Sequence, residues 1–197
     1  MYKRQILNGL PEPTRATRYY FGIDTGLSQD SSVLVVLSES GVLHSLVRIN
    51  GESIRDIGQR FTRELRKYDN LSGYVETNGV GQAMFEEVKR DARSARPFVT
   101  TNDSKVRMIR GLIQDMQEGV LQLPSKNLSP EMYGELASYT YKLGQNGKIH
   151  FSHPPGGHDD TIMALAMANM ARNELKGGAS SKIYVGGANQ YTAARFG

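Results

Sequence analysis

The chain of 197 residues has no cysteine, four histidines and a formal net charge of +4 at pH 7. This length fits one domain with a core of its own, and the missing cysteine excludes disulfides and thiolate metal sites. So few histidines argue against an imidazole-dominated metal site. No apolar run approaches the ~20 residues of a membrane span and no apolar signal core follows Met1, so we expect a protein that is neither secreted nor in a membrane.

The basic residues at the two ends of the chain account for more than the whole positive charge, and the body between them is slightly acidic. The overall charge therefore does not indicate a nucleic-acid-binding face. Three local basic clusters remain, and a solvated helix face explains each as well as a contact with phosphate does. They are Arg55, Arg60, Arg63, Arg66 and Lys67; Arg90, Arg93 and Arg96; and Lys105, Arg107 and Arg110.

Residues 1–18, with Pro11 and Pro13, are expected to form a linker or arm before the first regular element. Three β-rich runs follow, and the turns between them are short enough for an antiparallel meander. Ser53 then precedes apolar residues at helical spacing, which predicts a capped helix. The runs are 19–24, 33–37 and 42–49, the turns are 26–30 and 39–41, and the helical apolar residues are Ile54, Ile57, Phe61 and Leu65.

The second half of the chain alternates short strands with helices. The helix that starts at Asp103 or Ser104 should stop at Gly119, and the pair Asn146-Gly147 predicts a β-hairpin. Residues 176–197, rich in Gly, Ser and Ala, are expected to form a flexible tail. The predicted strands are 73–76, 98–100, 139–143 and 148–151, and an apolar run covers 120–123. The other predicted helices are about 81–93, 130–138 and 158–175. In the helix before Gly119, the residues expected to point inward are Val106, Ile109, Leu112, Ile113 and Met116.

This order of elements predicts an α/β fold, a mixed β-sheet of an antiparallel meander plus parallel strands, with helices on both faces. In such sheets, ligands and catalytic groups gather at the carboxyl ends of the strands. Asp24 closes the first predicted strand, and Glu76 closes another. We therefore expect these two carboxylates to approach each other.

Each acidic residue also has an ordinary explanation. Aspartate is common at turns, which accounts for Asp24, and Glu76 at a strand end can point to solvent. Asp159 and Asp160 are favoured at a helix N-terminus by the helix dipole and by capping. Asp160, however, lies one turn before Met163, on the face with which the helix packs, where an acid needs a cation.

Converging carboxylates repel one another and raise each other's pKa unless a cation lies between them. A site built from Asp24, Glu76, Asp159 and Asp160 offers only oxygen ligands, which suit Mg²⁺ or Mn²⁺. His158 has three possible roles: it could shuttle a proton, contact a phosphate or be an ordinary surface histidine. The sequence supports no Ser/His/Asp or Cys/His nucleophile arrangement.

These residues resemble the nuclease domain of the large terminase subunit of tailed bacteriophages, which is RNase H-like in fold. The resemblance covers roughly residues 19–172. The motifs that carry it are Gly22-Ile23-Asp24-Thr25-Gly26, Val75-Glu76-Thr77-Asn78-Gly79 and His158-Asp159-Asp160 followed by Ala164-Leu165-Ala166, with a similar helix at 105–119 before Leu123-Pro124.

By position, the resemblance implies that Asp24, Glu76 and Asp160 are catalytic, metal-binding carboxylates, with Asp159 as an auxiliary ligand. It implies phosphodiester hydrolysis with two Mg²⁺ or Mn²⁺ ions, both bridged by Asp24 from the central strand. Some relatives in the superfamily have a further acid where this chain has Met163, so the second ion depends on Asp159 or on DNA phosphate. The substrate would be double-stranded DNA held by its phosphates, and the candidate contacts are Lys105, Arg107, Arg110 and His158.

Large terminases also carry an ATPase domain, but no G-x-x-x-x-G-K-[ST] phosphate loop occurs in this chain. We therefore expect residues 19–175 to be the nuclease domain, monomeric in isolation, with residues 1–18 as the former interdomain linker. It would be either separated from a longer protein or encoded on its own. The resemblance implies that the domain cuts concatemeric viral DNA in the host cytoplasm, with an ATPase domain, a small terminase subunit and a portal as partners.

Three alternatives stay open. A Holliday-junction resolvase or transposase uses the same acidic geometry. A fourth acid at the position of Met163 would favour this alternative, and the chain has none there. An enzyme of this kind would also cut four-way junctions in preference to linear duplex. A sugar-kinase or actin-like ATPase half also starts with a strand, an aspartate and glycines, but it needs a second glycine-rich phosphate loop and a longer chain. A non-catalytic DNA-binding module would shift DNA mobility and leave plasmid intact.

Overall fold

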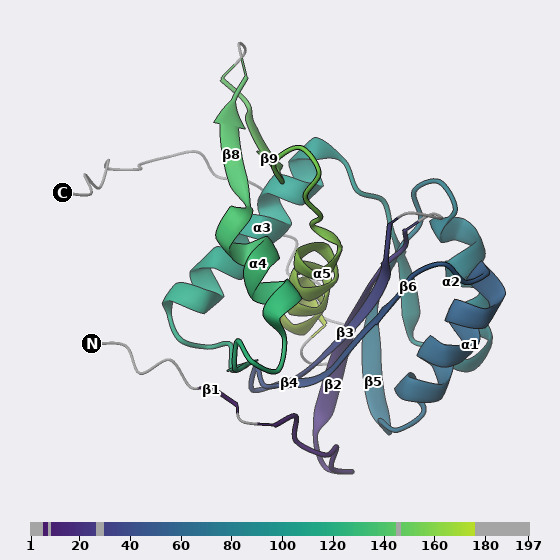
Figure 1. Ribbon diagram of the computed structural model, residues 1–197. Helices are drawn as coiled ribbons and strands as arrows, with labels where there is room; N and C mark the ends of the chain where they lie inside the picture. Colours follow the sequence, from purple (N-terminus) through teal and green to yellow (C-terminus); the bar gives the residue numbers. More distant parts are fainter. Residues whose placement is uncertain (1–5, 8, 27–29, 145–146, 176–197) are drawn as a thin grey trace.

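The computed structural model describes residues 6–7, 9–26, 30–144 and 147–175. A five-stranded mixed sheet lies between two groups of helices (Figure 1). The predicted α/β architecture is therefore confirmed. One face is covered by α1 (Ile54–Leu65) and α2 (Gly81–Asp91), and the other by α3 (Asn102–Gln117), α4 (Pro130–Ser138) and α5 (Asp160–Glu174).

The sheet combines an antiparallel meander with two parallel additions. The strand order is β4 (Leu43–Ile49), β3 (Ser32–Ser38), β2 (Arg18–Asp24), β5 (Asn70–Glu76) and β6 (Ala95–Phe98). β2, β3 and β4 pair antiparallel, whereas β5 joins β2, and β6 joins β5, in parallel. Because parallel neighbours end on the same side of a sheet, the last residues of β2 and β5 come together.

The strands β2 and β3 are buried along nearly their whole length because helices cover both faces of the sheet. Alternate residues serve two separate cores. Phe21 and Ile23 pack toward α1 and α2, while Val33 and Val35 pack toward α3, α4 and α5. Since Asp24 pairs with Val33 across the ladder, its side chain lies on the α5 side of the sheet.

The helix α5 lies directly on β2, and Gly22 makes this close approach possible. A Cβ atom at Gly22 would stand 2.2 Å from the carbonyl oxygen of Ala164 and 2.5 Å from the backbone nitrogen of Ala168. The helix is buried on nearly all sides, as expected for an apolar segment between the sheet and α3. The packing of β2 against α5 therefore fixes the start of this helix relative to the end of β2.

The two ends of α5 are attached to different strands. At its start, Asp160 forms an ion pair with Arg48 of β4. At its end, Glu174 accepts a hydrogen bond from the hydroxyl of Tyr74 on β5. The helix thus spans the sheet from the meander to the parallel strands.

Most predicted element boundaries hold within a few residues. Ser53 caps α1 through a hydrogen bond from the Asp56 nitrogen to its hydroxyl, as predicted. The strand predicted at 98–100 lies earlier, as β6, because Thr101 begins a capping box that starts α3. The last helix starts at Asp160 and not at His158.

The inward face of α3 is narrower than predicted. Met108, Ile109 and Leu112 are buried, but Ile113 is 40% exposed, so the expectation that it points inward is wrong. Apolar residues from 106 to 116 cover more of the helix circumference than the core contacts. Gly119, with φ of +70°, ends the helix as predicted.

Part of the predicted arm is attached to the body of the domain. β1 (Ile6–Leu7), which the sequence did not predict, pairs in parallel with β7 (Leu123–Pro124). The carbonyl oxygen of Pro11 lies 2.8 Å from Nδ1 of His44. The predicted tail at 176–197 lies outside the described residues.

The predicted hairpin is confirmed as β8 (Thr140–Leu143) and β9 (Ile149–Ser152), and it extends away from the sheet (Figure 1). Residues 145–146 of its turn, like residues 27–29 of the first turn, are outside the described part of the chain. Among the helices of the described residues, none is long and apolar enough to cross a membrane.

Candidate active site

Asp24 and Glu76 meet at the carboxyl ends of neighbouring parallel strands. The ladder pairs Ile23 of β2 with Val75 of β5, so the residues that follow are side by side. Asp24 is only 8% exposed, while Glu76 is partly exposed. The sequence prediction that these two carboxylates approach each other therefore agrees with the structure.

The pKa of Asp24 lies well above the usual aspartate range. Burial is the largest cause, and the next are a hydrogen bond with Glu76 and the negative charge of that residue. The carboxylates of Asp160 and Asp159 raise the same pKa further. Three acidic side chains thus act on the buried carboxyl group of Asp24, which is the electrostatic signature of a site that a cation would stabilise.

The helix start of α5 brings Asp159 and Asp160 to the same site. Asp159 occupies the N-cap position but makes no side-chain cap bond, so capping does not explain it. Asp160 is 8% exposed, and its Oδ2 accepts hydrogen bonds from the Ser31 nitrogen at 3.3 Å and from Arg48 Nη2 at 3.2 Å. The inward direction predicted for Asp160 agrees with this burial.

The pKa of Asp160 is also raised, and burial is again the largest cause. Arg48, the Ser31 nitrogen and His158 oppose the shift, while Glu135 adds to it. Burial thus outweighs the favourable contacts, so this carboxyl group, like that of Asp24, holds its proton more tightly than a solvated aspartate does.

The basic residues of α3 have different surroundings. Lys105 Nζ lies 2.8 Å from Asp159 Oδ2 and over the ring of Tyr139, so it belongs to the acidic site and not to the outer surface. Arg107 is 4.0 Å from Glu174, and Arg110 is exposed. The predicted DNA contacts on this helix therefore do not share one face.

His158 is exposed beside the acids. Its Nδ1 lies 4.0 Å from Oδ2 of Asp160 and 3.9 Å from Oδ1 of Asp30. This location is compatible with each role that the sequence left open, a proton shuttle, a phosphate contact or a surface residue.

The described residues contain no group of three or more acidic or histidine side chains that could hold a metal ion as they stand. Two of the four acids are instead paired with basic side chains, Asp160 with Arg48 and Asp159 with Lys105.

The site nevertheless fits a hard divalent cation. Its donors are all carboxylate oxygens, the kind that Mg²⁺ and Mn²⁺ prefer. The buried hydroxyl of Thr25, next to Asp24, has no hydrogen-bond partner among the described residues. A cation would also relieve the repulsion that raises the pKa of Asp24.

The sequence model of the Terminase RNaseH-like domain matches residues 21–172. This chain belongs to that family. The large terminase subunit of Thermus phage G20c is 30% identical over 152 residues, which are 76% of this chain and 31% of that protein. The chain thus spans about a third of the length of the curated relatives it matches.

Solved structures agree with this terminase assignment. The crystal structure of the large terminase nuclease from the thermophilic phage G20c has a TM-score of 0.71 at 28% identity, over 81% of this chain and 84% of that one. The same nuclease with bound magnesium has a TM-score of 0.70 at 28% identity, with the same coverage. The RNase H-like terminase nuclease fold expected from the sequence is therefore confirmed.

Met163 of this terminase domain is 4% exposed and belongs to the core under α5. It lies one turn beyond the acids, at the position where the sequence lacks a further carboxylate. The side chain therefore contributes packing to the helix and no ligand to the site.

Sequence reasoning missed three residues beside the acids: Arg48, Glu135 and Tyr139. Glu135 is 7% exposed on the face of α4 that also buries Met132, three residues earlier. A glutamate at helical spacing from an inward apolar residue was the available signal. For Tyr139, burial is the largest cause that raises its pKa, followed by the charge of Asp159.

Proposed function

We propose that this terminase domain is a metal-dependent endodeoxyribonuclease that cuts concatemeric double-stranded DNA with little sequence preference. The convergence of Asp24 and Glu76 at two strand ends, with Asp159 and Asp160 acting on the same buried carboxyl group, is the observation that carries the proposal. The G20c relative, which is a large terminase nuclease with bound magnesium, supports it.

In this proposal Asp24, Glu76 and Asp160 hold two Mg²⁺ or Mn²⁺ ions, with Asp159 as an auxiliary ligand. Such ions, when bound, activate water and stabilise the departing 3′ oxygen of a phosphodiester. The protein holds Asp24 and Asp160 in buried positions, while Glu76 is partly exposed. His158, exposed 4.0 Å from Asp160, is available to accept a proton or contact a phosphate.

DNA is proposed to bind mainly through its phosphates. Arg110 and His158 are exposed, and Arg107 reaches the surface beside Glu174. Contacts of this kind are independent of base sequence, which supports the expected low sequence preference. Lys105 pairs with Asp159, so its charge would lie inside the acidic site and not on the DNA-binding surface.

The longer relatives lead us to propose a wider context. Residues 19–175 would be the nuclease domain of a large terminase subunit, with residues 1–18 as its linker and 176–197 as a tail. Its partners would then be an ATPase domain, a small terminase subunit and a portal, and it would act in the cytoplasm of the infected host.

The decisive experiment measures nicking of supercoiled plasmid with Mn²⁺ or Mg²⁺. We expect metal-dependent cleavage that Asp24→Asn, Glu76→Gln and Asp160→Asn each reduce at least about 100-fold, as expected when a group of the reaction centre is removed. The exposed Glu118→Gln is the matched control and should cleave as the wild type does. Normal cleavage by Asp24→Asn would contradict the proposal, and intact plasmid with a retained mobility shift would favour a DNA-binding module.

A further inference from the structure

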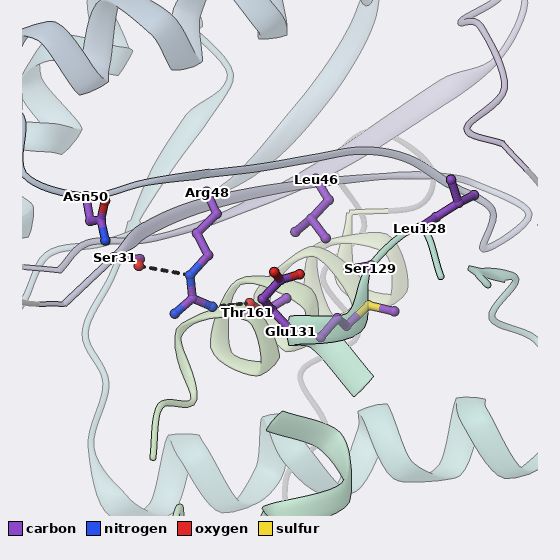
Figure 2. A pocket seen from close by; sticks show the side chains of 9 residues that line it. Ser31, Leu46, Arg48, Asn50, Leu128, Ser129, Glu131 and Thr161 are labelled. Carbon is purple, nitrogen blue, oxygen red and sulfur yellow. Dashed lines mark hydrogen bonds between the residues drawn. The ribbon is translucent and has the colours of Figure 1, made fainter. Parts of the chain in front are cut away.

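The guanidinium of Arg48 is held by several elements beside the acidic site. From β4 its Nε donates to the Ser31 hydroxyl at 2.9 Å, and its Nη1 donates to the Thr161 hydroxyl at 3.0 Å and to Glu135. Figure 2 shows the side chain extended from β4 between Ser31 and Thr161. These three contacts fix the guanidinium independently of Asp160.

Glu135 anchors this arrangement from α4. Its Oε2 accepts hydrogen bonds from the backbone nitrogens of Thr161 at 2.9 Å and Ile162 at 3.2 Å, and its Oε1 pairs with Arg48. The carboxylate therefore caps the first turn of α5 and neutralises Arg48 at the same time. Glu135 therefore joins Arg48 of β4 to the backbone of the first turn of α5.

The side chain of Asp160 is held by Arg48 and Ser31 through one oxygen. In the part of the chain that the structure describes, both the Ser31 nitrogen and Arg48 Nη2 donate to Oδ2 of Asp160. Oδ2 is thereby committed, and Oδ1 is the oxygen left for a cation. Outer contacts of this kind orient a metal-binding carboxylate.

We propose that Arg48, held by Glu135, is a positioning residue that fixes Asp160 through Oδ2 and so sets the affinity of the site for a divalent cation. This inference rests on the proposed function and adds a role to it. The forked guanidinium is required for this role, because only its planar geometry can reach Ser31, Glu135 and Asp160 together.

Charge and geometry make opposite predictions for Arg48. A positive side chain beside a cation site repels the cation, so a charge effect alone predicts tighter binding when the arginine is removed. Positioning predicts weaker binding when Arg48 is replaced, even by lysine, which keeps the charge and loses the fork. The cavity of about 440 Å³ that Arg48 lines leaves room for either replacement.

The test is calorimetric titration of the metal-free protein with Mn²⁺, in the absence of DNA. We expect Arg48→Lys and Arg48→Met to bind Mn²⁺ about 10–100-fold more weakly than the wild type, the usual effect of losing an outer contact at a metal site. Arg63→Lys, an exposed arginine of α1, is the matched control and should bind normally. Raised Mn²⁺ should restore plasmid cleavage by Arg48→Lys and not by Asp24→Asn.

Unchanged affinity in Arg48→Lys, or tighter binding in Arg48→Met, overturns the inference. Ser31→Ala removes one contact to the guanidinium and should weaken binding about fivefold, as for a single hydrogen bond, so it serves if an Arg48 variant does not fold. Asp24→Asn separates the two proposals. If it keeps its Mn²⁺ affinity and cleavage, the proposed function fails; if it loses both while Arg48→Lys behaves as the wild type, only the positioning role fails.

Discussion

The carboxylate of Glu135 accepts a hydrogen bond from the backbone nitrogen of Thr161 at 2.9 Å, which joins α4 to the first turn of α5. Asp159 occupies the N-cap position of α5 without a side-chain cap bond. The unpaired N–H groups of a helix start need acceptors, and here another helix supplies one. The two acids at the start of α5 thus have no capping role, and their side chains pair with Arg48 and Lys105 instead.

Loss of this cap should destabilise the domain. Glu135→Ala removes the acceptor for two backbone N–H groups and leaves the Arg48 guanidinium without one of its two buried carboxylate partners, so we expect a loss of about 3–5 kcal/mol in the free energy of unfolding. Glu135→Gln keeps an acceptor and should lose less. Urea denaturation with metal chelated measures both, and a wild-type midpoint for Glu135→Ala would refute this account of the cap.

The contact between β2 and α5 provides a second stability test. Gly22→Ala forces a Cβ atom to within 2.2 Å of the Ala164 carbonyl oxygen, so the helix must move away from the strand. We expect a loss of at least about 1–3 kcal/mol, as for an overpacked core. Cleavage should fall as well, because the start of α5 shifts relative to Asp24.

Gly111→Ala is the matched control for Gly22→Ala. Gly111 lies inside α3, and a Cβ atom there meets nothing within 4 Å. Alanine should therefore stabilise the domain by about 0.5–1 kcal/mol through helix propensity. If both substitutions changed the urea midpoint equally, close packing at Gly22 would not be the cause.

The meeting of Asp24 and Glu76 could be predicted because each residue ends a strand with its own local pattern. Buried strands with both faces covered give continuous apolar runs, and the sequence shows one around Phe21 in β2. Around Val75 the apolar stretch is shorter, because Ser72 and Gly73 interrupt it before Glu76. Two antiparallel strands and then the helix α1 lie between β2 and β5, an order that returns β5 in the same direction as β2. Local patterns and one topological rule were sufficient for this half of the candidate site.

The contacts around Asp160 could not be predicted in the same way. Arg48 and Glu135 are separated by 87 residues, and neither belongs to a motif. Their pairing depends on where α4 lies after a long excursion of the chain, which hydrophobic periodicity does not determine. The same limit explains Lys105: its sequence indicates a surface cation, and only the packing of α3 beside α5 brings it to Asp159.

Phosphate binding by α3 should appear in the salt dependence of DNA affinity. Arg110→Ala should weaken binding to duplex DNA uniformly across sequences and reduce the slope of log K against log [salt] by about 0.9, as for one lost phosphate contact. Arg66→Ala is the control. Arg66 pairs with Asp91 and is the C-cap residue of α1, which covers the face of the sheet opposite α3. Fluorescence anisotropy at several salt concentrations gives the slopes, and equal slopes for wild type and Arg110→Ala would exclude this contact.

The raised pKa of Asp24 should make the metal-free domain less stable as the pH rises. The folded state holds this proton more tightly than the unfolded chain, whose aspartate has the ordinary value of 3.8. The unfolding free energy therefore falls by about 1.4 kcal/mol for each pH unit between the unfolded and the folded pKa of this group. Below the unfolded value, both states are protonated and the effect vanishes.

Asp24→Asn removes this ionisation and retains an amide that can donate to Glu76. With metal chelated, the variant should be more stable than the wild type at pH 7 and equal to it near pH 3, by urea denaturation at each pH. Asp69→Asn, an exposed aspartate with a 3.9 Å pair to Arg15, should shift stability by less than about 0.5 kcal/mol at either pH. A metal-free Asp24→Asn protein that is less stable than the wild type at pH 7 would show that crowding of the acids does not destabilise the fold.

With saturating Mg²⁺ the wild type should become the more stable of the two proteins at pH 7. A cation that binds only the folded wild type stabilises it by mass action.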